Sequence, residues 1–183
     1  MKDESKCLHS GYTPASGGPG VMPIYQSTTF RYNSTEEIAA VFDDPTKSHI
    51  YSRFTNPTVD AVEKKIADLE HGAAAMCTSS GQMASLMSVL NLCGDSFISS
   101  SAVYGGTVNL FAVTLKKFGI ECIFVDVDAD EEEIRAKIKP NTKAIFGETL
   151  TNPSLQIFDI EKFAKVAHEN KIPLIVDNTF ATP

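Results

Sequence analysis

The sequence predicts an α/β protein built around a largely parallel β-sheet. From residue 56 on, short apolar runs alternate with stretches whose apolar residues recur at helical spacing, which is typical of consecutive βα units. The chain has 183 residues, of which 43% are hydrophobic and 21% charged, and this composition is ordinary for a soluble globular protein. The length therefore allows one domain with a substantial core.

Residues 1–55 are expected to form an extended N-terminal arm. Gly, Pro, Ser and Thr are frequent in this segment, as in "GYTPASGGPGVMP" and "DDPTKSH". One short helix is predicted around Glu36 to Phe42, because the cap-like run Asn33-Ser34-Thr35 precedes it.

The first long helix is predicted to begin at Asn56-Pro57, where an amide can cap the helix and proline suits the first position. Its apolar residues recur on one face, and Gly72 is expected to stop it just after His71. This face consists of Val59, Val62, Ile66 and Leu69.

Five apolar runs are the predicted strands, at 73–77, 96–99, 121–125, 143–147 and 173–177. The stretches between them predict helices, because their apolar residues share one face. These faces are Met83, Leu86, Met87 and Leu90; Val108, Phe111, Leu115 and Phe118; Ile134 and Ile138; and Ile160, Phe163, Ala164 and Ala167.

Charge and cysteine usage exclude several classes of function. The net charge of −7, without a basic cluster, argues against a nucleic-acid partner, because a polyanion would be repelled. The cysteines are widely spaced and form no C-x-x-C pair, so neither a metal site nor a disulfide framework is expected. Four reduced thiols are expected instead, at Cys7, Cys77, Cys93 and Cys122.

The N-terminus, "MKDESKCLHSGYTP", lacks the apolar core of a signal peptide. No later run approaches the roughly 18 apolar residues of a membrane span. We therefore expect a cytoplasmic protein without a membrane partner.

Polar residues follow the predicted strands at their carboxyl ends, where open α/β sheets bind ligands. "TSSGQM" at 78–83 offers free N–H groups at a helix start, which suit a phosphate, although a simple Ser N-cap explains the same residues. Tyr104 could stack on a flat ligand or fill a hydrophobic gap, and Asn152 before Pro153 could simply form a turn. Asp177, at the end of an apolar run taken to be a buried strand, should meet a cation or a strong donor, or else cap a helix.

Together these groups suit a phosphorylated heteroaromatic cation such as pyridoxal 5'-phosphate, whose ring nitrogen pairs with an aspartate. A Rossmann dinucleotide site is the competing interpretation. It would need G-x-G-x-x-G between a strand and a helix, and the only glycine-rich piece, "SGGPG" at 16–20, follows no strand.

Five motifs, in order and spacing, resemble the Cys/Met-metabolism enzymes of fold type I. They are "IYSRFTNPT" (50–58), "SSGQMA" (79–84), "AVYGGTVNLF" (102–111), "ETLTNP" (148–153) and "IVDNTFATP" (175–183). The resemblance covers the chain from about residue 20 and corresponds to the N-terminal half of such an enzyme. It implies an arm at 1–55 that contacts a neighbouring subunit, followed at 56–183 by a truncated fold type I large domain.

The resemblance also implies roles for individual residues. Tyr51 and Arg53 match the pair that holds the cofactor phosphate of a neighbouring subunit, and a guanidinium suits this because it can bind phosphate bidentately. Tyr104 matches the residue that stacks on the pyridine ring and takes part in proton transfer. Asp177 matches the acid on the ring nitrogen, and Asn152 the amide near the ring hydroxyl. The other expected cofactor-binding residues are Ser80, Gly81, Gln82 and Thr179, the backbone amides of Gly81 and Gln82 holding the phosphate; no metal is expected.

In this family the Schiff-base lysine and the domain that binds the substrate carboxylate lie beyond the "VDNTF" strand. The 183 residues are therefore expected to be a fragment that is inactive alone. A non-catalytic module that binds a cofactor or partner is the alternative from another class.

The resemblance favours replacement of acetate on O-acetyl-L-homoserine by sulfide or methanethiol, giving homocysteine or methionine. "SGQ" and "YGGT" resemble the O-acetylhomoserine sulfhydrylases, whereas methionine γ-lyases carry "YGCT". Methionine γ-lyase and cystathionine γ-synthase or lyase remain alternatives. Because a phosphate contact from a neighbouring subunit requires that subunit, the resemblance implies at least a homodimer and favours a tetramer.

Overall fold

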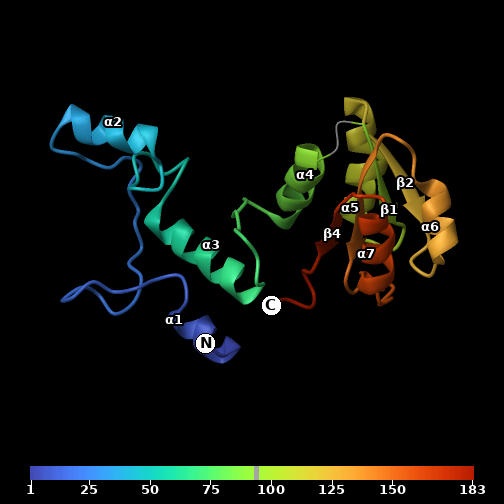
Figure 1. Cartoon of the computed structure of the whole chain (residues 1–183), viewed down its shortest axis with the longest axis horizontal. Helices are drawn as coiled ribbons and strands as arrows, with labels where there is room; N and C mark the ends of the chain where they lie inside the picture. Colours follow the sequence, from blue (N-terminus) through green and yellow to red (C-terminus); the bar gives the residue numbers. More distant parts are fainter. Residues whose placement is uncertain (93–94) are drawn as a thin grey trace. The chain divides into compact units, whose positions relative to one another are not determined.

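The computed structural model describes residues 1–92 and 95–183, so Cys93 lies outside the described residues. The chain divides into two compact units, each described by itself (Figure 1). The N-terminal unit contains Met1–Cys77 together with Pro183, and the C-terminal unit contains Thr78–Thr182. This division falls after the first long helix.

The N-terminal unit contains three helices, α1 (Asp3–His9), α2 (Thr35–Asp43) and α3 (Pro57–Leu69). Helices α2 and α3 were predicted, and both begin at the expected caps. The Ser34 side chain accepts a hydrogen bond from Glu37 N, and the Asn56 side chain accepts one from Thr58 N.

Helix α1 was not predicted, since the arm was expected to contain only the short helix around Glu36 to Phe42. Lys6 Nζ donates to Asp68 O at 3.1 Å, and Lys65 Nζ donates to Cys7 O at 2.9 Å, so α1 is held against α3. Asp3 in its first turn and Lys6 in its last turn also complement the helix dipole. These contacts are long-range, and the apolar periodicity of the sequence gives no sign of them.

The C-terminal unit contains a parallel four-stranded sheet, β1 (Ser96–Ser100), β2 (Glu121–Val125), β3 (Thr142–Glu148) and β4 (Leu174–Asp177), in the order β2-β1-β3-β4. Ile98 of β1 aligns with Ile145 of β3, and Glu148 of β3 aligns with Asp177 of β4. Four of the five predicted strands are therefore confirmed, within about one residue at each end.

The fifth predicted strand, at 73–77, is wrong. These residues are irregular, and Met76 and Cys77 are exposed. A strand exists only when its backbone N–H and C=O groups are paired with a neighbour, and residues 73–77 pair with no strand among the described residues.

Helices cover both faces of the sheet. On one face lie α6 (Glu131–Lys137) and α7 (Ile160–Glu169) (Figure 1). Their residues Ile134, Phe163 and Val166 pack against Ile98 and Ile145 of the sheet. Of the predicted faces, Ile134, Phe163 and Ala167 are buried as expected, but Ile160 at the start of α7 is 40% exposed and Ile138 follows the end of α6. Val166, which is buried, was not predicted.

The other face carries α4 (Gly81–Leu92) and a segment made of α5 (Gly105–Asn109), a π-helical turn η1 (Leu110–Thr114) and a 3₁₀ turn η2 (Leu115–Phe118). Val89, Phe111 and Leu115 pack there against Phe97 and Phe146. Phe118 was expected on the buried face but is exposed, because the π-helical and 3₁₀ turns change the helical spacing.

None of the helices within residues 1–92 and 95–183 has the length and apolar character needed to cross a membrane.

Candidate functional site

A hollow of about 230 Å³ lies at the carboxyl ends of β3 and β4, within the C-terminal unit. Six predicted site residues line this hollow. They come from four separate sequence motifs. They are Gly81, Gln82, Tyr104, Asn152, Asp177 and Thr179. Ser85, Thr107, Glu148 and Phe180 also line it and were not predicted.

The start of α4 forms one wall. Ser80 Oγ accepts from Met83 N at 3.2 Å, so the simple capping role considered for this serine is present. The N–H groups of Gly81 and Gln82 belong to the first turn of this twelve-residue helix and have no partner among the described residues. Free amides at a helix start favour an anion, as the phosphate prediction requires.

Tyr104 is the N-cap residue of α5, and its side chain is half exposed. Its ring lies directly over Gly106, because a Cβ built at that glycine would overlap the ring and come within 2.9 Å of Gln82 Nε2. Any side chain larger than hydrogen at 106 would displace this ring or the Gln82 amide. The tyrosine therefore presents an aromatic face at the hollow, rather than filling a gap in the core.

Asp177 is half-buried, which corrects the expectation of an acid at the end of a fully buried strand. The reason is that β4 is the edge strand of the described sheet, and all four of its residues are only partly covered. Asp177 Oδ1 accepts from Thr179 N at 3.1 Å and from Thr179 Oγ1 at 2.5 Å. Thr179 thereby fixes one carboxylate oxygen and leaves the other for a cation.

Glu148 is the residue that the sequence reasoning missed. It is the last residue of β3, is 4% exposed, and its Oε2 accepts from Tyr104 N at 2.6 Å. Burial raises the pKa of its carboxyl, the Tyr104 N–H opposes this, and the nearby Asp177 raises it further. The sequence did contain a signal for Glu148, because this residue lies at the carboxyl end of a predicted strand and is the first residue of the motif "ETLTNP".

Asn152 lies in the loop that follows β3 and precedes Pro153 through a cis peptide bond. The loop folds back on itself, since Thr151 N donates to Gln156 O at 3.1 Å and Phe158 N donates to Thr149 O at 3.1 Å. The predicted turn is confirmed, and it places Asn152 at the rim of the hollow.

Tyr51 and Arg53 belong to the N-terminal unit and do not line this hollow. The Arg53 guanidinium lies 5.2 Å from the Tyr51 ring centroid and 5.4 Å from that of Phe54. In the part of the chain that the structure describes, Arg53 has no carboxylate within ion-pair distance. Its cation is available for another anion.

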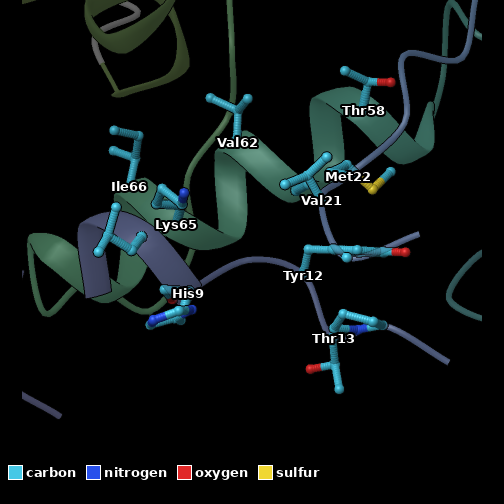
Figure 2. Close-up of a pocket in the computed structure, with 14 residues that line it drawn as sticks. His9, Tyr12, Thr13, Val21, Met22, Thr58, Val62, Lys65 and Ile66 are labelled. Atoms are coloured by element: carbon cyan, nitrogen blue, oxygen red, sulfur yellow. The ribbon is translucent and has the colours of Figure 1, made fainter. Parts of the chain in front are cut away.

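A second hollow, of about 470 Å³, lies within the N-terminal unit between α1, the arm and α3. Figure 2 shows Val62, Ile66 and Lys65 of α3 along it, with Tyr12 and Val21 from the arm. Lys65 is the one lysine or arginine in this lining, and its Nζ already donates to Cys7 O. No predicted site residue lines this hollow.

The groups around the first hollow fit pyridoxal 5'-phosphate. Free amides at α4 suit the phosphate, the Tyr104 face suits the ring, and the free oxygen of Asp177 suits a protonated ring nitrogen. Within residues 1–92 and 95–183, no group of three or more His, Cys, Asp or Glu side chains is placed to hold a metal ion.

Known proteins give the same indication. The sequence model of the Cys/Met metabolism PLP-dependent enzymes matches residues 4–183. The O-acetyl-L-homoserine sulfhydrylase of Corynebacterium glutamicum is 45% identical over 182 residues, which are 98% of this chain and 42% of the relative. The homocysteine synthase of Schizosaccharomyces pombe is 44% identical over 180 residues, or 97% of this chain and 42% of the relative. The chain thus spans less than half the length of these curated relatives.

Two solved structures are also similar. That of a Campylobacter jejuni protein described as an O-acetylhomoserine (thiol)-lyase, which contains a pyridoxyl-lysine phosphate, matches with a TM-score of 0.93 and 39% identity, over 100% of this chain and 45% of that one. Cystathionine γ-lyase of Lactobacillus plantarum, in complex with L-serine, matches with a TM-score of 0.86 and 39% identity, over 99% of this chain and 45% of the other. The fold is therefore that of the fold type I enzymes, and the chain belongs to the Cys/Met metabolism family of pyridoxal-phosphate-dependent enzymes.

Proposed function

We propose that this chain forms the N-terminal part of an enzyme that replaces the acetate of O-acetyl-L-homoserine with sulfide or methanethiol. The observation that carries the proposal is the crowding at Gly106, where a Cβ would come within 2.5 Å of the Tyr104 ring and 2.9 Å of Gln82 Nε2. These residues belong to the "SGQ" and "YGGT" motifs that favour a sulfhydrylase. The names of the Corynebacterium and Schizosaccharomyces relatives support the same reaction.

Each wall of the hollow has a proposed task. The N–H groups of Gly81 and Gln82 bind the cofactor phosphate, with Ser80 holding the turn in place. Tyr104 stacks on the ring, and its hydroxyl moves a proton at the substrate side chain. Asp177, oriented by Thr179, keeps the ring nitrogen protonated, and Asn152 contacts the ring hydroxyl. When bound, the cofactor supplies an electron sink for the carbanion at the substrate Cα.

Tyr51 and Arg53 are proposed to bind the phosphate of a cofactor held by a neighbouring subunit. The absence of an ion-pair partner for Arg53 among the described residues supports this role. A homodimer is then the smallest active assembly, and a tetramer of two such dimers is the assembly we propose. We place it in the cytoplasm, where sulfide and O-acetylhomoserine would be available.

The 183 residues are proposed to be inactive by themselves. The lysine that binds the cofactor covalently would be contributed by polypeptide outside this chain, as would the groups that bind the substrate carboxylate. Borohydride reduction followed by intact-mass measurement tests this on the protein from its natural source. A mass above 19.8 kDa with one reduced cofactor is expected; a 19.8 kDa protein without adduct would contradict it and favour a binding module.

The reaction is tested by incubating the full-length protein with O-acetyl-L-homoserine and sulfide, and measuring homocysteine and acetate. Parallel reactions with methionine alone, and with cysteine in place of sulfide, test the lyase and cystathionine γ-synthase alternatives. Homocysteine formation should be at least about tenfold more efficient than either alternative. A protein that instead releases methanethiol from methionine at the higher efficiency would be a methionine γ-lyase.

A further inference from the structure

A buried carboxylate that the proposed chemistry does not use lies between two groups that it does use. Glu148 ends β3, aligns with Asp177 on β4, and reaches across to the loop that follows β1. An unpaired buried carboxylate is costly, so its single hydrogen bond identifies what it is placed to hold. That bond is to the backbone N–H of Tyr104.

The contact holds Tyr104 from its N-terminal side. The Tyr104 carbonyl accepts from Thr107 N at 2.8 Å and from Val108 N at 3.0 Å, so the first turn of α5 fixes that end of the residue. The N–H lies outside this turn, and Glu148 Oε2 is its partner at 2.6 Å. Because the N–H and the C=O of Tyr104 are both hydrogen-bonded, its backbone is held in place and its ring lies over Gly106.

We propose that Glu148 is a positioning residue that holds the Tyr104 ring in place over the cofactor by accepting the Tyr104 N–H. The inference rests on the proposed function, in which Tyr104 stacks on the cofactor ring. Glu148 itself touches neither the cofactor nor the substrate in this proposal.

The acceptor oxygen is what matters, and not the negative charge. Because burial favours the protonated form of this carboxyl, the site tolerates a neutral side chain there. Glu148→Gln keeps an acceptor oxygen at the same reach, whereas Glu148→Leu removes it. Glu148→Asp keeps the charge but shortens the side chain by one methylene, which withdraws the oxygen from the amide.

The experiment measures two quantities in the full-length protein. Hydrogen exchange of the peptide that contains residues 102–108, in the cofactor-free protein, reports the Tyr104 N–H directly. Titration with pyridoxal 5'-phosphate gives the cofactor Kd. Glu148→Leu and Glu148→Asp should each speed exchange and weaken the cofactor about tenfold, whereas Glu148→Gln should stay within about twofold of wild type.

The matched control is Thr142→Val, at the opposite end of the same strand. Thr142 is buried, and its hydroxyl accepts from Lys139 N at 2.9 Å, far from the hollow. This variant should lose stability while exchange at 102–108 and the cofactor Kd stay unchanged. The Glu148 effects would then reflect the contact and not a general loss of stability.

Three results would overturn the inference: wild-type behaviour of Glu148→Leu, a Glu148→Gln variant as weak as Glu148→Leu, or a Glu148→Asp variant closer to wild type than Glu148→Gln. The last would assign the role to charge beside Asp177. If the Glu148→Leu variant does not fold, the comparison of Glu148→Asp with Glu148→Gln alone decides whether the acceptor oxygen holds Tyr104. A wild-type protein that does not bind pyridoxal 5'-phosphate would contradict the proposed function, while exchange in the cofactor-free protein would still decide the Tyr104 contact.

Discussion

The two units are held together by different kinds of interaction. In the C-terminal unit, large apolar side chains of the sheet and of both helix layers are fully buried, including Phe97 and Phe146 of the sheet and Phe111 and Phe163 of the covering segments. In residues 1–77, all of which the structure describes, Val41 is the one buried apolar side chain, and the thirteen-residue helix α3 buries none. Burial of apolar surface therefore stabilises the C-terminal unit far more than the N-terminal unit.

In the N-terminal unit, hydrogen bonds and helix caps contribute more to stability than apolar burial does. The buried Asn56 side chain accepts from Thr58 N at 2.9 Å and donates to Tyr25 O at 3.0 Å and to Ser52 Oγ at 2.9 Å. It thereby ties the arm to the start of α3. Such a segment keeps its local helices but gains little from its own core, which suits an arm whose apolar face would be covered in the assembly proposed above.

The largest expected effect is in the core of the sheet. Phe146→Ala should lower the free energy of unfolding by about 3–5 kcal/mol. It removes a buried ring that packs edge-on against Phe111, with 4.9 Å between the two ring centroids. Val62→Ala in α3, where the side chain is 47% exposed, should cost less than about 1 kcal/mol. Urea denaturation followed by circular dichroism measures both. Equal losses would mean that the two units are not stabilised differently.

A smaller effect is expected where β3 meets its covering loop. Gly147→Ala should cost about 1–3 kcal/mol, because its Cβ would overlap the Phe158 ring. Gly105→Ala is the matched control, since a Cβ at that position meets nothing within 4 Å. Thermal unfolding compares the two variants. A Gly147→Ala protein as stable as Gly105→Ala would show that the Phe158 ring moves aside freely.

The same contrast explains what the sequence could predict. Four strands and the helices that cover them were found because a buried sheet imposes strong apolar patterns, as at Phe163 in α7. Helix α1 was missed because its contact through Lys6 is polar and long-range, which leaves no periodicity. The predicted strand at 73–77 failed for the opposite reason, since an apolar run does not reveal whether a pairing strand exists.

At the candidate site, too, the sequence predicted residues in local patterns and missed those whose role depends on long-range contacts. Tyr104, Asn152 and Asp177 were predicted because each lies at or just after the carboxyl end of a recognisable strand. Gly81 was predicted from its helix-start motif, although the run before it is not a strand, and the structure brings all four residues to one hollow. Glu148 was not predicted, because its role depends on a hydrogen bond across two strands to a backbone N–H. The half-burial of Asp177 was also out of reach, since edge position follows from sheet order rather than from local sequence.

In the N-terminal unit, the cap of α3 should matter more than that of α2. Asn56→Ala should lower the unfolding free energy by about 1–2 kcal/mol, because it removes a cap and leaves Tyr25 O and Ser52 Oγ without their donor. Ser34→Ala should cost about 0.5 kcal/mol, because the Ser34 side chain accepts one solvent-accessible cap bond, from Glu37 N. Hydrogen exchange at 57–69 and 35–43 measures each locally. A larger loss for Ser34→Ala would reverse the assignment.

The smallest expected effect is a pH dependence within the C-terminal unit. Burial raises the Glu148 pKa above its ordinary 4.5, so the folded protein keeps a proton that the unfolded chain has lost. The stability from this proton is present below pH 4.5 and is lost as pH rises through the folded pKa, and Glu148→Gln should abolish that fall. Glu131 has the opposite sign, because Lys165 and Arg135 lower its pKa, so its contribution is lost as pH falls.

Unfolding free energies measured between pH 4 and 8 for wild type and Glu148→Gln separate the two effects, because the Glu131 contribution is common to both proteins and cancels in their difference. A difference that changes with pH in the stated direction would confirm that Glu148 is titrated inside the fold. A difference that is constant across this range would mean that water reaches the carboxylate. The Tyr104 N–H would then be bound by a carboxylate in contact with water. The candidate site would in that case not share the tight burial that distinguishes the core of the C-terminal unit from the N-terminal unit.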